Sequence, residues 1–204
     1  MATHAYFATH IYRGALPASA AALNRQLARE CHQLRLDDAA GRRWSAHNYP
    51  GGYTSYGSAH RLHQLSPTFA ALARHVDAHV RRFARVLRFD LTGRPLALTD
   101  CWVNIMGPGT THGLHLHPLA TLSGTYYVRV PRGAPGPKFE DPRLGLFMAA
   151  PPRARRAPRA QRAWVSLPVR AGQLLLFESW LRHEVPPHGR AAERISVSFN
   201  YGWF

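Results

Sequence analysis

The spacing of apolar residues changes near residue 95, and this change limits the folds that the chain can adopt. After residue 95, short segments with strand-like alternation follow one another, separated by turn signals rich in glycine and proline. The candidate strands are residues 98–106, 121–130, 163–168, 173–177 and 194–201. Short and closely spaced strands of this kind are typical of a jelly-roll or cupin-like barrel.

The first 95 residues have helical spacing in two segments. One amphipathic segment lies within residues 17–41. The other begins at Ser66 and Pro67, a favourable N-cap followed by proline in the first turn, and its apolar stripe runs to Leu87. The predicted fold class is therefore α+β: a jelly-roll or cupin-like barrel with two N-terminal helices that buttress one of its sheets.

The length of 204 residues suits one hydrophobic core and is too short to argue for two. We expect a single domain over residues 1–204, with mainly helical support in 1–95 and the β-strand core in 96–204. The chain has only two cysteines, Cys31 and Cys101, without the spacing of a disulfide framework or a thiolate zinc site. With no leader-like N-terminus and no apolar run near the ~20 residues of a membrane span, we expect a cytoplasmic protein.

The formal charge of +15 raises the question of a nucleic-acid partner. Only Lys138 among the 26 basic residues is a lysine, and most arginines are scattered among alanine and proline. Nucleic acid is therefore not the expected partner. The one basic cluster, residues 153–162, is interpreted as a solvated loop, and it would favour a small-molecule or peptide substrate that is acidic. The long stretch around it, residues 132–162, has the length of a lid.

Histidines gather in two short segments, and this is the sharpest chemical signal in the sequence. His115 and His117 form an H-x-H pair next to His112, and His183 follows the strand-like run 173–177. Strand side chains alternate between faces, so both rings of an H-x-H pair point to the same side. Two neighbouring imidazoles and a distant third, with open positions left over, are typical of a non-haem iron site.

Arg194 opens the last predicted strand, and alternation puts it on one face with Ser196, Ser198 and Asn200. A guanidinium binds a carboxylate through two parallel hydrogen bonds. Arg194 with the Ser196 hydroxyl is thus a candidate site for the far carboxylate of a dicarboxylate cosubstrate. Tyr127 is expected to face the same side and Tyr126 the opposite side.

Several motifs together resemble one known family. They are Trp102-Val-Asn104, His115-Leu-His-Pro118, Leu122-Ser-Gly-Thr-Tyr-Tyr-Val128, Asp141-Pro-Arg143, Gly172-Gln-Leu-Leu-Leu-Phe177 and Arg194-Ile-Ser-Val-Ser-Phe-Asn200. In order and spacing the sequence resembles the 2-oxoglutarate/Fe(II)-dependent oxygenases, in particular the bacterial group with H-x-H-P, L-S-G-x-Y-Y and R-I-S-x-S-F-N motifs. The resemblance extends over most of the chain.

The resemblance implies a double-stranded β-helix fold, with the β-helix core in residues 96–204. It also implies a dioxygenase that uses Fe(II) and 2-oxoglutarate, with metal positions at His115, His117 and His183 and the cosubstrate arginine at Arg194. The expected reaction is hydroxylation of a substrate, with decarboxylation of 2-oxoglutarate to succinate. Tyr127, Ser196 and Asn104 are the further candidate cosubstrate contacts.

One departure from the wider superfamily leaves the ligand set open. The superfamily has a carboxylate where His117 stands, so either three imidazoles hold the iron, or His112 or His117 lies outside the ligand set and Asp141 or Glu184 completes it. Two rival functions also remain: a non-catalytic, metal-binding cupin-like module and a three-histidine cupin dioxygenase that does not use 2-oxoglutarate. The dicarboxylate role of Arg194 argues against the three-histidine cupin dioxygenase.

The substrate is not specified by these motifs. Aromatic and cationic candidates for the pocket rim are Trp44, Tyr49, Tyr53, Trp180 and Arg182. Trp102 and Asn104, on one face of their strand, are expected near the metal.

Overall fold

Two antiparallel sheets face each other in the computed structural model, which describes residues 1–189 and 191–204. The larger sheet has the order β1 (Ile11–Ala15), β8 (Gln173–Glu178), β5 (Leu122–Arg129), β10 (Arg194–Trp203), β3 (Leu96–Met106) and β2 (Gly52–Thr54). The smaller sheet has the order β4 (His112–His115), β9 (His183–Val185), β6 (Lys138–Glu140) and β7 (Trp164–Ser166). The chain thus has the predicted α+β fold, a jelly-roll of the double-stranded β-helix type.

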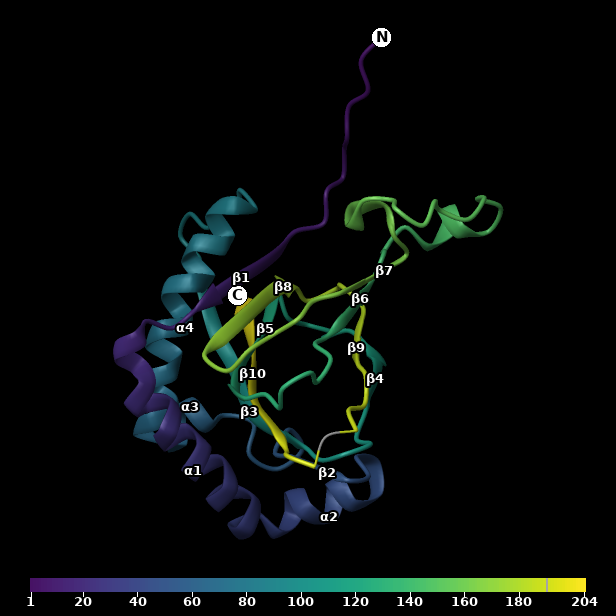
Figure 1. The fold of residues 1–204 in the computed structure, drawn as a ribbon. Helices are drawn as coiled ribbons and strands as arrows, with labels where there is room; N and C mark the ends of the chain where they lie inside the picture. Colours follow the sequence, from purple (N-terminus) through teal and green to yellow (C-terminus); the bar gives the residue numbers. More distant parts are fainter. Residues whose placement is uncertain (190) are drawn as a thin grey trace.

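The helices lie on the outer side of the larger sheet, along its left and lower edge in Figure 1. They are α1 (Ala21–Asp37), α2 (Ala39–Asn48), α3 (Leu62–Leu65) and α4 (Pro67–Val86), with single 3₁₀ turns at Ala18–Ala20, Leu144–Phe147 and Arg159–Gln161. The two predicted helices correspond to α1 and α4. No helix in the described part of the chain combines the length and the apolarity that crossing a membrane requires.

Helix α4 begins where its sequence predicts. Ser66 is the N-cap, and its Oγ accepts a hydrogen bond from the backbone N–H of Thr68 at 3.1 Å. Pro67 occupies the first turn, where its missing N–H costs no hydrogen bond. The apolar stripe from Phe69 to Phe83 is buried against the sheet, so that α4 buttresses the strands behind the site.

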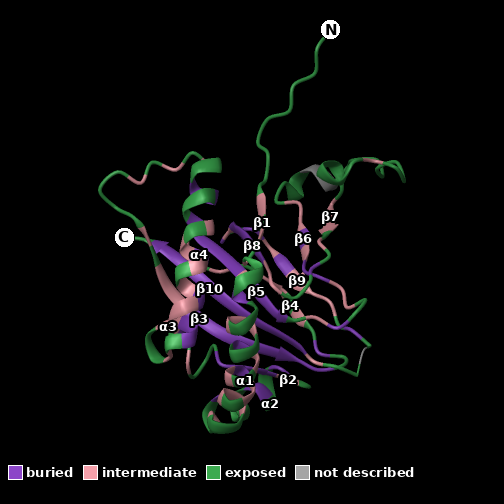
Figure 2. Ribbon diagram, turned by 60° about the vertical axis from the view of Figure 1, so that its left-hand side comes forward, coloured by how far each residue is buried: buried purple, intermediate pink, exposed green. Residues whose placement is uncertain are grey.

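Alternation on the strands divides the core into two parts. Side chains on one face of the larger sheet pack against the helices, as Figure 2 shows for the purple strands behind the green outer helix faces. Side chains on the other face pack between the two sheets, around Phe139, Leu175 and Phe177. Tyr126 belongs to the first group and Tyr127 to the second, as the sequence predicts.

Truncation of a core leucine tests this packing. Leu176 is completely buried between the sheet and the helices. We expect Leu176→Ala to lower the free energy of unfolding by about 2–5 kcal/mol, because it removes buried methyl groups and leaves a cavity. Urea denaturation measures the change, and the matched control is Leu36→Ala, at a leucine that is 65% exposed. A loss of less than about 1 kcal/mol for Leu176→Ala would contradict the packing described.

Five short strands and two short helices add to the predicted elements. Strands β1 and β2 extend the larger sheet from within the first 95 residues, and β4, β6 and β9 form most of the smaller sheet. Helix α2 follows α1 after Asp38, whose Oδ1 accepts a hydrogen bond from Gly41 N at 2.8 Å. Residues 132–162 contain β6 and then extend away from the two sheets, toward the upper right of Figure 1.

Candidate metal centre and adjoining cavities

The smaller sheet brings three distant histidines together. His115 ends β4 and pairs across the sheet with His183, which begins β9. His117 follows β4, and its backbone N–H donates to Ser179 O at 2.9 Å, which holds the chain beside the segment between β8 and β9. One nitrogen from each of the three rings lies within 4.8 Å of the others, a separation that suits ligands of a single metal ion.

Hydrogen bonds orient each of these rings. The Nδ1 atoms of His115 and His183 lie 2.7 Å from Gly113 O and 2.9 Å from Leu181 O. A carbonyl oxygen can only accept, so Nδ1 carries the proton and Nε2 keeps its lone pair in both rings. Neutral imidazoles with a fixed tautomer are what metal ligation requires. The donor set and its orientation therefore fit Fe(II).

His117 is oriented by a side chain. Its Nδ1 donates to Asn200 Oδ1 at 2.7 Å, and the same oxygen accepts from Ser123 Oγ at 2.8 Å. The Asn200 amide nitrogen in turn donates to Asp100 Oδ2 at 3.4 Å. Asn200 is on the predicted polar face of β10, but the sequence offers no spacing signal for its contact with His117.

Burial keeps the histidines neutral. Desolvation lowers the pKa of His183 to about 3 and that of His117 to about 4, and it lowers the pKa of His115 as well. The pKa of His112, whose ring stacks on that of His115 at 4.3 Å between centroids, is lowered to about 3 by the same cause. Four uncharged imidazoles therefore line this part of the protein at neutral pH.

The alternative ligands lie elsewhere or have other partners. Within the described chain, the group of possible metal ligands comprises His115, His117 and His183, without His112. Asp141 binds the guanidinium of Arg143 at 2.7 and 2.9 Å, and that contact lowers the pKa of the Asp141 carboxyl. Glu184 forms an ion pair with Lys138 at 2.8 Å. Neither carboxylate joins the histidine group.

Arg194 is a buried cation, only 1% exposed. Its Nη1 donates to Pro135 O at 2.5 Å and its Nη2 to the sulfur of Met106 at 3.1 Å. These bonds use two of the five N–H groups of a guanidinium. Among the described residues, no carboxylate forms an ion pair with Arg194.

A narrow inner cavity connects Arg194 with the histidines. We use this name for the space lined by Tyr49, Trp102, Asn104, Met106, His112, His115, His117, Thr125, Tyr127, His183, Val185, Arg194, Ser196 and Ser198. Three of the predicted cosubstrate contacts form a row across neighbouring strands, because Ser196 on β10 is opposite Asn104 on β3 and Tyr127 on β5. The positive charge of Arg194 lowers the pKa of the Tyr127 and Tyr49 hydroxyls, which burial raises more strongly. Tyr127, Tyr49 and Arg194 thus line the same cavity.

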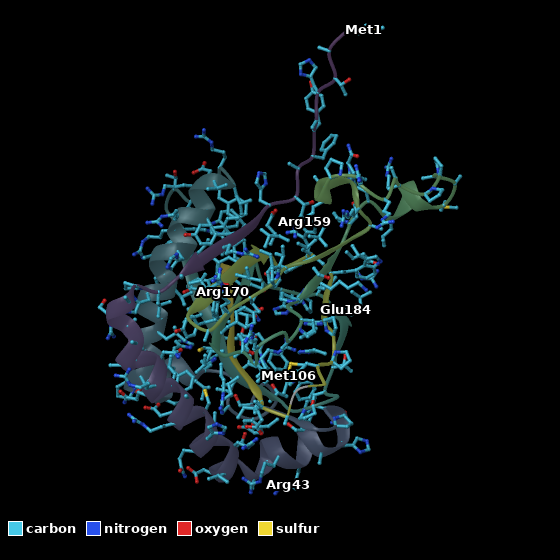
Figure 3. All side chains as sticks on the ribbon, viewed as in Figure 1. Met1, Arg43, Met106, Arg159, Arg170 and Glu184 are labelled. Carbon is cyan, nitrogen blue, oxygen red and sulfur yellow. The ribbon has the colours of Figure 1, made fainter. Side chains whose placement is uncertain are left out.

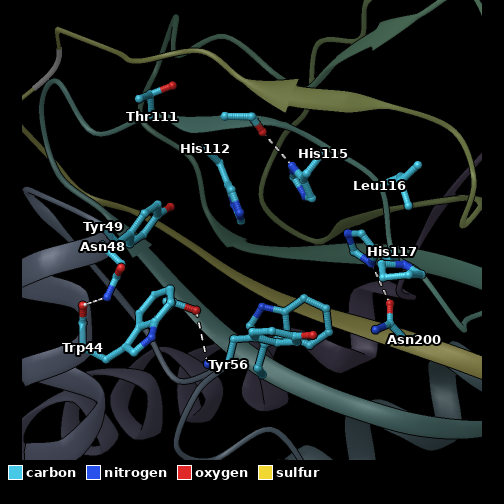
Figure 4. A pocket seen from close by; sticks show the side chains of 14 residues that line it. Trp44, Asn48, Tyr49, Tyr56, Thr111, His112, His115, Leu116, His117 and Asn200 are labelled. Atoms are coloured by element: carbon cyan, nitrogen blue, oxygen red, sulfur yellow. Dashed lines mark hydrogen bonds between the residues drawn. The ribbon is translucent and has the colours of Figure 1, made fainter.

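A wider outer cavity of about 230 Å³ adjoins the inner one and opens to solvent (Figure 4). It is lined by Trp44, Asn48, Tyr49, Thr54, Tyr56, Trp102, Thr111, His112, Gly113, His115, Leu116, His117, Pro118 and Asn200. In Figure 4, His112 and His115 extend from β4 on one side, and Trp44 and Tyr56 lie on the opposite side. Since His115 and His117 line both cavities, a molecule in the outer cavity reaches the metal centre.

Two of the five expected rim residues line a cavity, and the other three do not. Trp44 and Tyr49 line the outer cavity. Tyr53 belongs to the core against the helices, and its hydroxyl donates to Asp38 Oδ2 at 2.9 Å. Trp180 and Arg182 line neither of the two cavities. Tyr49 lines the inner cavity as well, together with Arg194, and its buried hydroxyl has no hydrogen-bond partner among the described residues.

Comparison with known proteins identifies one family. The model of a family described as "Putative 2OG-Fe(II) oxygenase" matches residues 100–200, which contain the three histidines and Arg194. No curated protein is significantly similar in sequence.

Solved structures with the same fold cover nearly the whole chain. A prolyl-4-hydroxylase of Pseudomonas putida has a TM-score of 0.60 and 18% identity, over 95% of this chain and 92% of that one. The epimerase SnoN of nogalamycin biosynthesis has a TM-score of 0.63 and 17% identity, over 95% and 76%. HygX of Streptomyces hygroscopicus, solved with nickel and 2-oxoglutarate bound, has a TM-score of 0.62 and 15% identity, over 96% and 83%. At such identities the likeness shows the fold.

Proposed function

We propose that this chain, a member of the 2OG-Fe(II) oxygenases, holds Fe(II) through His115, His117 and His183 and binds the far carboxylate of 2-oxoglutarate through Arg194. Fe(II) and 2-oxoglutarate, when bound, supply the oxidising chemistry of the family, in which 2-oxoglutarate is decarboxylated to succinate. We further propose that the reaction is hydroxylation of the substrate.

The cosubstrate assignment rests on one observation: Arg194 is buried and has no anionic partner among the described residues. A buried guanidinium without an anionic partner is costly, and Arg194 has no such partner in the described chain. It lines the same inner cavity as the three histidines, so a dicarboxylate that reaches the metal also reaches Arg194. A carboxylate there would gain bidentate hydrogen bonds from the guanidinium.

Neutral side chains around Arg194 complete the proposed carboxylate site. The hydroxyls of Tyr127 and Tyr49 keep their protons, since burial raises their pKa, and so they can donate to an anionic oxygen. Ser196 adds a third hydroxyl from the centre of β10. Asn104 Oδ1 is buried without a hydrogen-bond partner among the described residues, so Asn104 is a further candidate contact in the inner cavity.

Absorption spectroscopy tests the proposal. The purified protein is mixed anaerobically with Fe(II) and then with 2-oxoglutarate, and the weak visible charge-transfer band of such complexes is expected. On admission of oxygen, succinate is expected to form. Absence of the band would contradict the cosubstrate site, whereas a band without any succinate would favour the non-catalytic module. Oxygen consumption with a thiol and without 2-oxoglutarate would favour the three-histidine cupin dioxygenase.

Asn200 is proposed as a positioning residue that acts through His117. Its Oδ1 holds the Nδ1 proton of that ring, and Asp100 and Ser123 hold the Asn200 amide in turn. We expect Asn200→Ala to weaken metal binding about 10- to 100-fold, as loss of a ligand's hydrogen-bond partner typically does. Titration with Ni(II) or Co(II) measures this affinity in the absence of turnover. The matched control is Asn48→Ala, at an asparagine whose amide donates to Trp44 O, and equal losses in both variants would contradict the role of Asn200.

Three further proposals concern the whole chain. We propose that residues 1–204 form one domain, because α1 and α4 pack directly on the strands that carry the site. A cytoplasmic location is supported by the two cysteines, which are buried and unpaired. An acidic substrate remains a prediction based on the basic cluster 153–162. Figure 3 shows Arg159 of that cluster well apart from Met106, which contacts Arg194.

A further inference from the structure

We infer that the group oxidised by this enzyme is an uncharged ring, which enters the outer cavity and lies against Trp44 and Tyr56. The inference rests on the proposed function, since it takes the metal at His115, His117 and His183 as the place of reaction. It adds the chemical class of the substrate, for which the catalytic motifs hold no information.

The size of the outer cavity sets the first limit. Its volume is about 230 Å³, whereas a buried cavity of about 150 Å³ is known to hold one benzene molecule. The outer cavity therefore takes one ring with its substituents. It is too small for a whole peptide or oligosaccharide, but its open side allows the ring to be the end of a larger molecule.

The charge of the lining sets the second limit. The residues that line the outer cavity include no aspartate, glutamate, lysine or arginine. A charged group that entered would lose hydration without gaining a counter-charge, which is unfavourable. Arg194 lies in the inner cavity, where we have assigned it to 2-oxoglutarate. An acidic substrate would therefore have to carry its charge outside this cavity, on the part that remains in solvent.

The aromatic side chains set the third limit. Trp44 is 43% exposed and Tyr56 is 51% exposed, although both side chains are large and apolar. Tyr56 is held edge-on against the buried Trp102 ring at 5.0 Å between centroids, and the backbone N–H of Tyr56 donates to Thr54 Oγ1 at 3.3 Å. Flat, partly exposed rings that are fixed in place offer the faces on which another ring stacks.

Polar groups beside these rings are neutral as well. Asn48 and Thr111 lie in the lining, where they can form hydrogen bonds with ring substituents without adding charge. The Asn48 amide nitrogen already donates to the backbone oxygen of Trp44 at 3.0 Å, which fixes the Asn48 side chain at the end of helix α2. The expected substrate is therefore a ring with neutral polar substituents rather than a bare hydrocarbon.

A matched set of small probes tests the inference. The Ni(II)-loaded protein with 2-oxoglutarate is titrated with benzyl alcohol, cyclohexanol, benzoate, benzylammonium and the open-chain 1-hexanol. Ligand-observed NMR reports binding, and the faster relaxation of probe protons near paramagnetic Ni(II), relative to Zn(II), reports their approach to the metal. Benzyl alcohol and cyclohexanol are expected to bind at least about ten-fold more tightly than the charged rings and 1-hexanol, with enhanced relaxation, a difference of about 1.4 kcal/mol.

Variants separate stacking from nonspecific binding. Trp44→Ala is expected to weaken binding of the neutral rings about ten-fold, whereas Trp180→Ala, at a tryptophan that is 46% exposed outside both cavities, is expected to leave it unchanged. Binding of benzoate or benzylammonium as tight as that of the neutral rings would overturn the inference. So would equal binding of 1-hexanol, no binding of any probe, or no effect of Trp44→Ala.

The same samples distinguish this inference from the proposed function. Binding of 2-oxoglutarate is followed by isothermal titration calorimetry of the metal-loaded protein before any probe is added. If 2-oxoglutarate does not bind, the proposed function fails. If it binds and the probes show no preference, the inference about the substrate fails alone.

Discussion

Replacement of Arg194 by methionine is expected to abolish tight binding of 2-oxoglutarate while leaving the fold intact. Truncation of one partner of a buried, hydrogen-bonded charge pair costs about 2–5 kcal/mol, which corresponds to a rise in Kd of roughly 30-fold or more. Methionine has a comparable length and no charge, so Arg194→Met removes an unpaired buried cation from the free protein, where Arg194 is only 1% exposed. Without 2-oxoglutarate the variant should be at least as stable as the wild type.

Two measurements check this result. The visible band of the anaerobic Fe(II) complex, followed during titration with 2-oxoglutarate, gives Kd, and the melting temperature with and without 2-oxoglutarate gives the stabilisation by the ligand. The Kd of Arg194→Lys for 2-oxoglutarate should lie between the values of the wild type and Arg194→Met, because lysine keeps the charge and loses the bidentate geometry. The matched control is Arg170→Met, at an exposed arginine between β7 and β8. An unchanged Kd in Arg194→Met would refute the cosubstrate site.

The architecture could be predicted where the periodicity extends over several residues. The stripe of α4 and the alternation of β10 are long enough to assign both type and face, so Ile195 packs toward the helices and Ser196 toward the cavity. The strands that were missed are short. Strands β2, β6 and β9 have three residues each, too few for a period to be recognised. Strand β4 has an irregular register between His112 and His115, which hides its alternation.

The candidate site could be predicted only in part, for a physical reason. Histidines and an inward-facing arginine on a strand are rare enough to indicate chemistry from sequence, and the structure brings His115, His117 and His183 together. Tyrosine and asparagine occur in many structural roles, and the positions of Tyr49 and Asn200 depend on how distant elements pack. Tyr49 follows helix α2 and approaches Arg194 through the tertiary fold, and no spacing along the chain records that contact.

The ion-pair partners of the charged residues could not be predicted from the sequence either. Asp141 and Glu184 are alternatives for the third ligand in the sequence, because Asp141 lies in the Asp141-Pro-Arg143 motif and Glu184 directly follows His183. Cross-strand pairing brings Lys138 opposite Glu184, and the two form an ion pair at 2.8 Å. Asp141 turns back to Arg143 two residues later. Such contacts depend on strand register, which the sequence specifies only where one face is clearly buried.

Substitution distinguishes the roles of His112 and His117 at the metal centre. We expect His117→Ala to weaken metal binding by more than about 100-fold, beyond the effect of losing a partner such as Asn200, because a ligand itself is lost. His112→Ala should change the affinity less than about three-fold, since the ring of His112 stacks on His115 but lies outside the ligand group. Titration with Ni(II) or Co(II) gives both values without turnover.

A second substitution at position 117 tests what the His117 side chain contributes. His117→Asp restores the two-histidine, one-carboxylate set of the wider superfamily, so it should keep more metal affinity than His117→Ala. If His112→Ala lost as much affinity as His117→Ala, the ligand would have to be reassigned to His112. If His117→Asp bound no better than His117→Ala, position 117 would contribute through packing. The ring of His117 tilts against Trp102 at 5.8 Å, so a packing role would appear as loss of thermal stability in both variants. A ligand role predicts that the alanine variant alone loses the metal, with the melting temperature of the metal-free protein little changed.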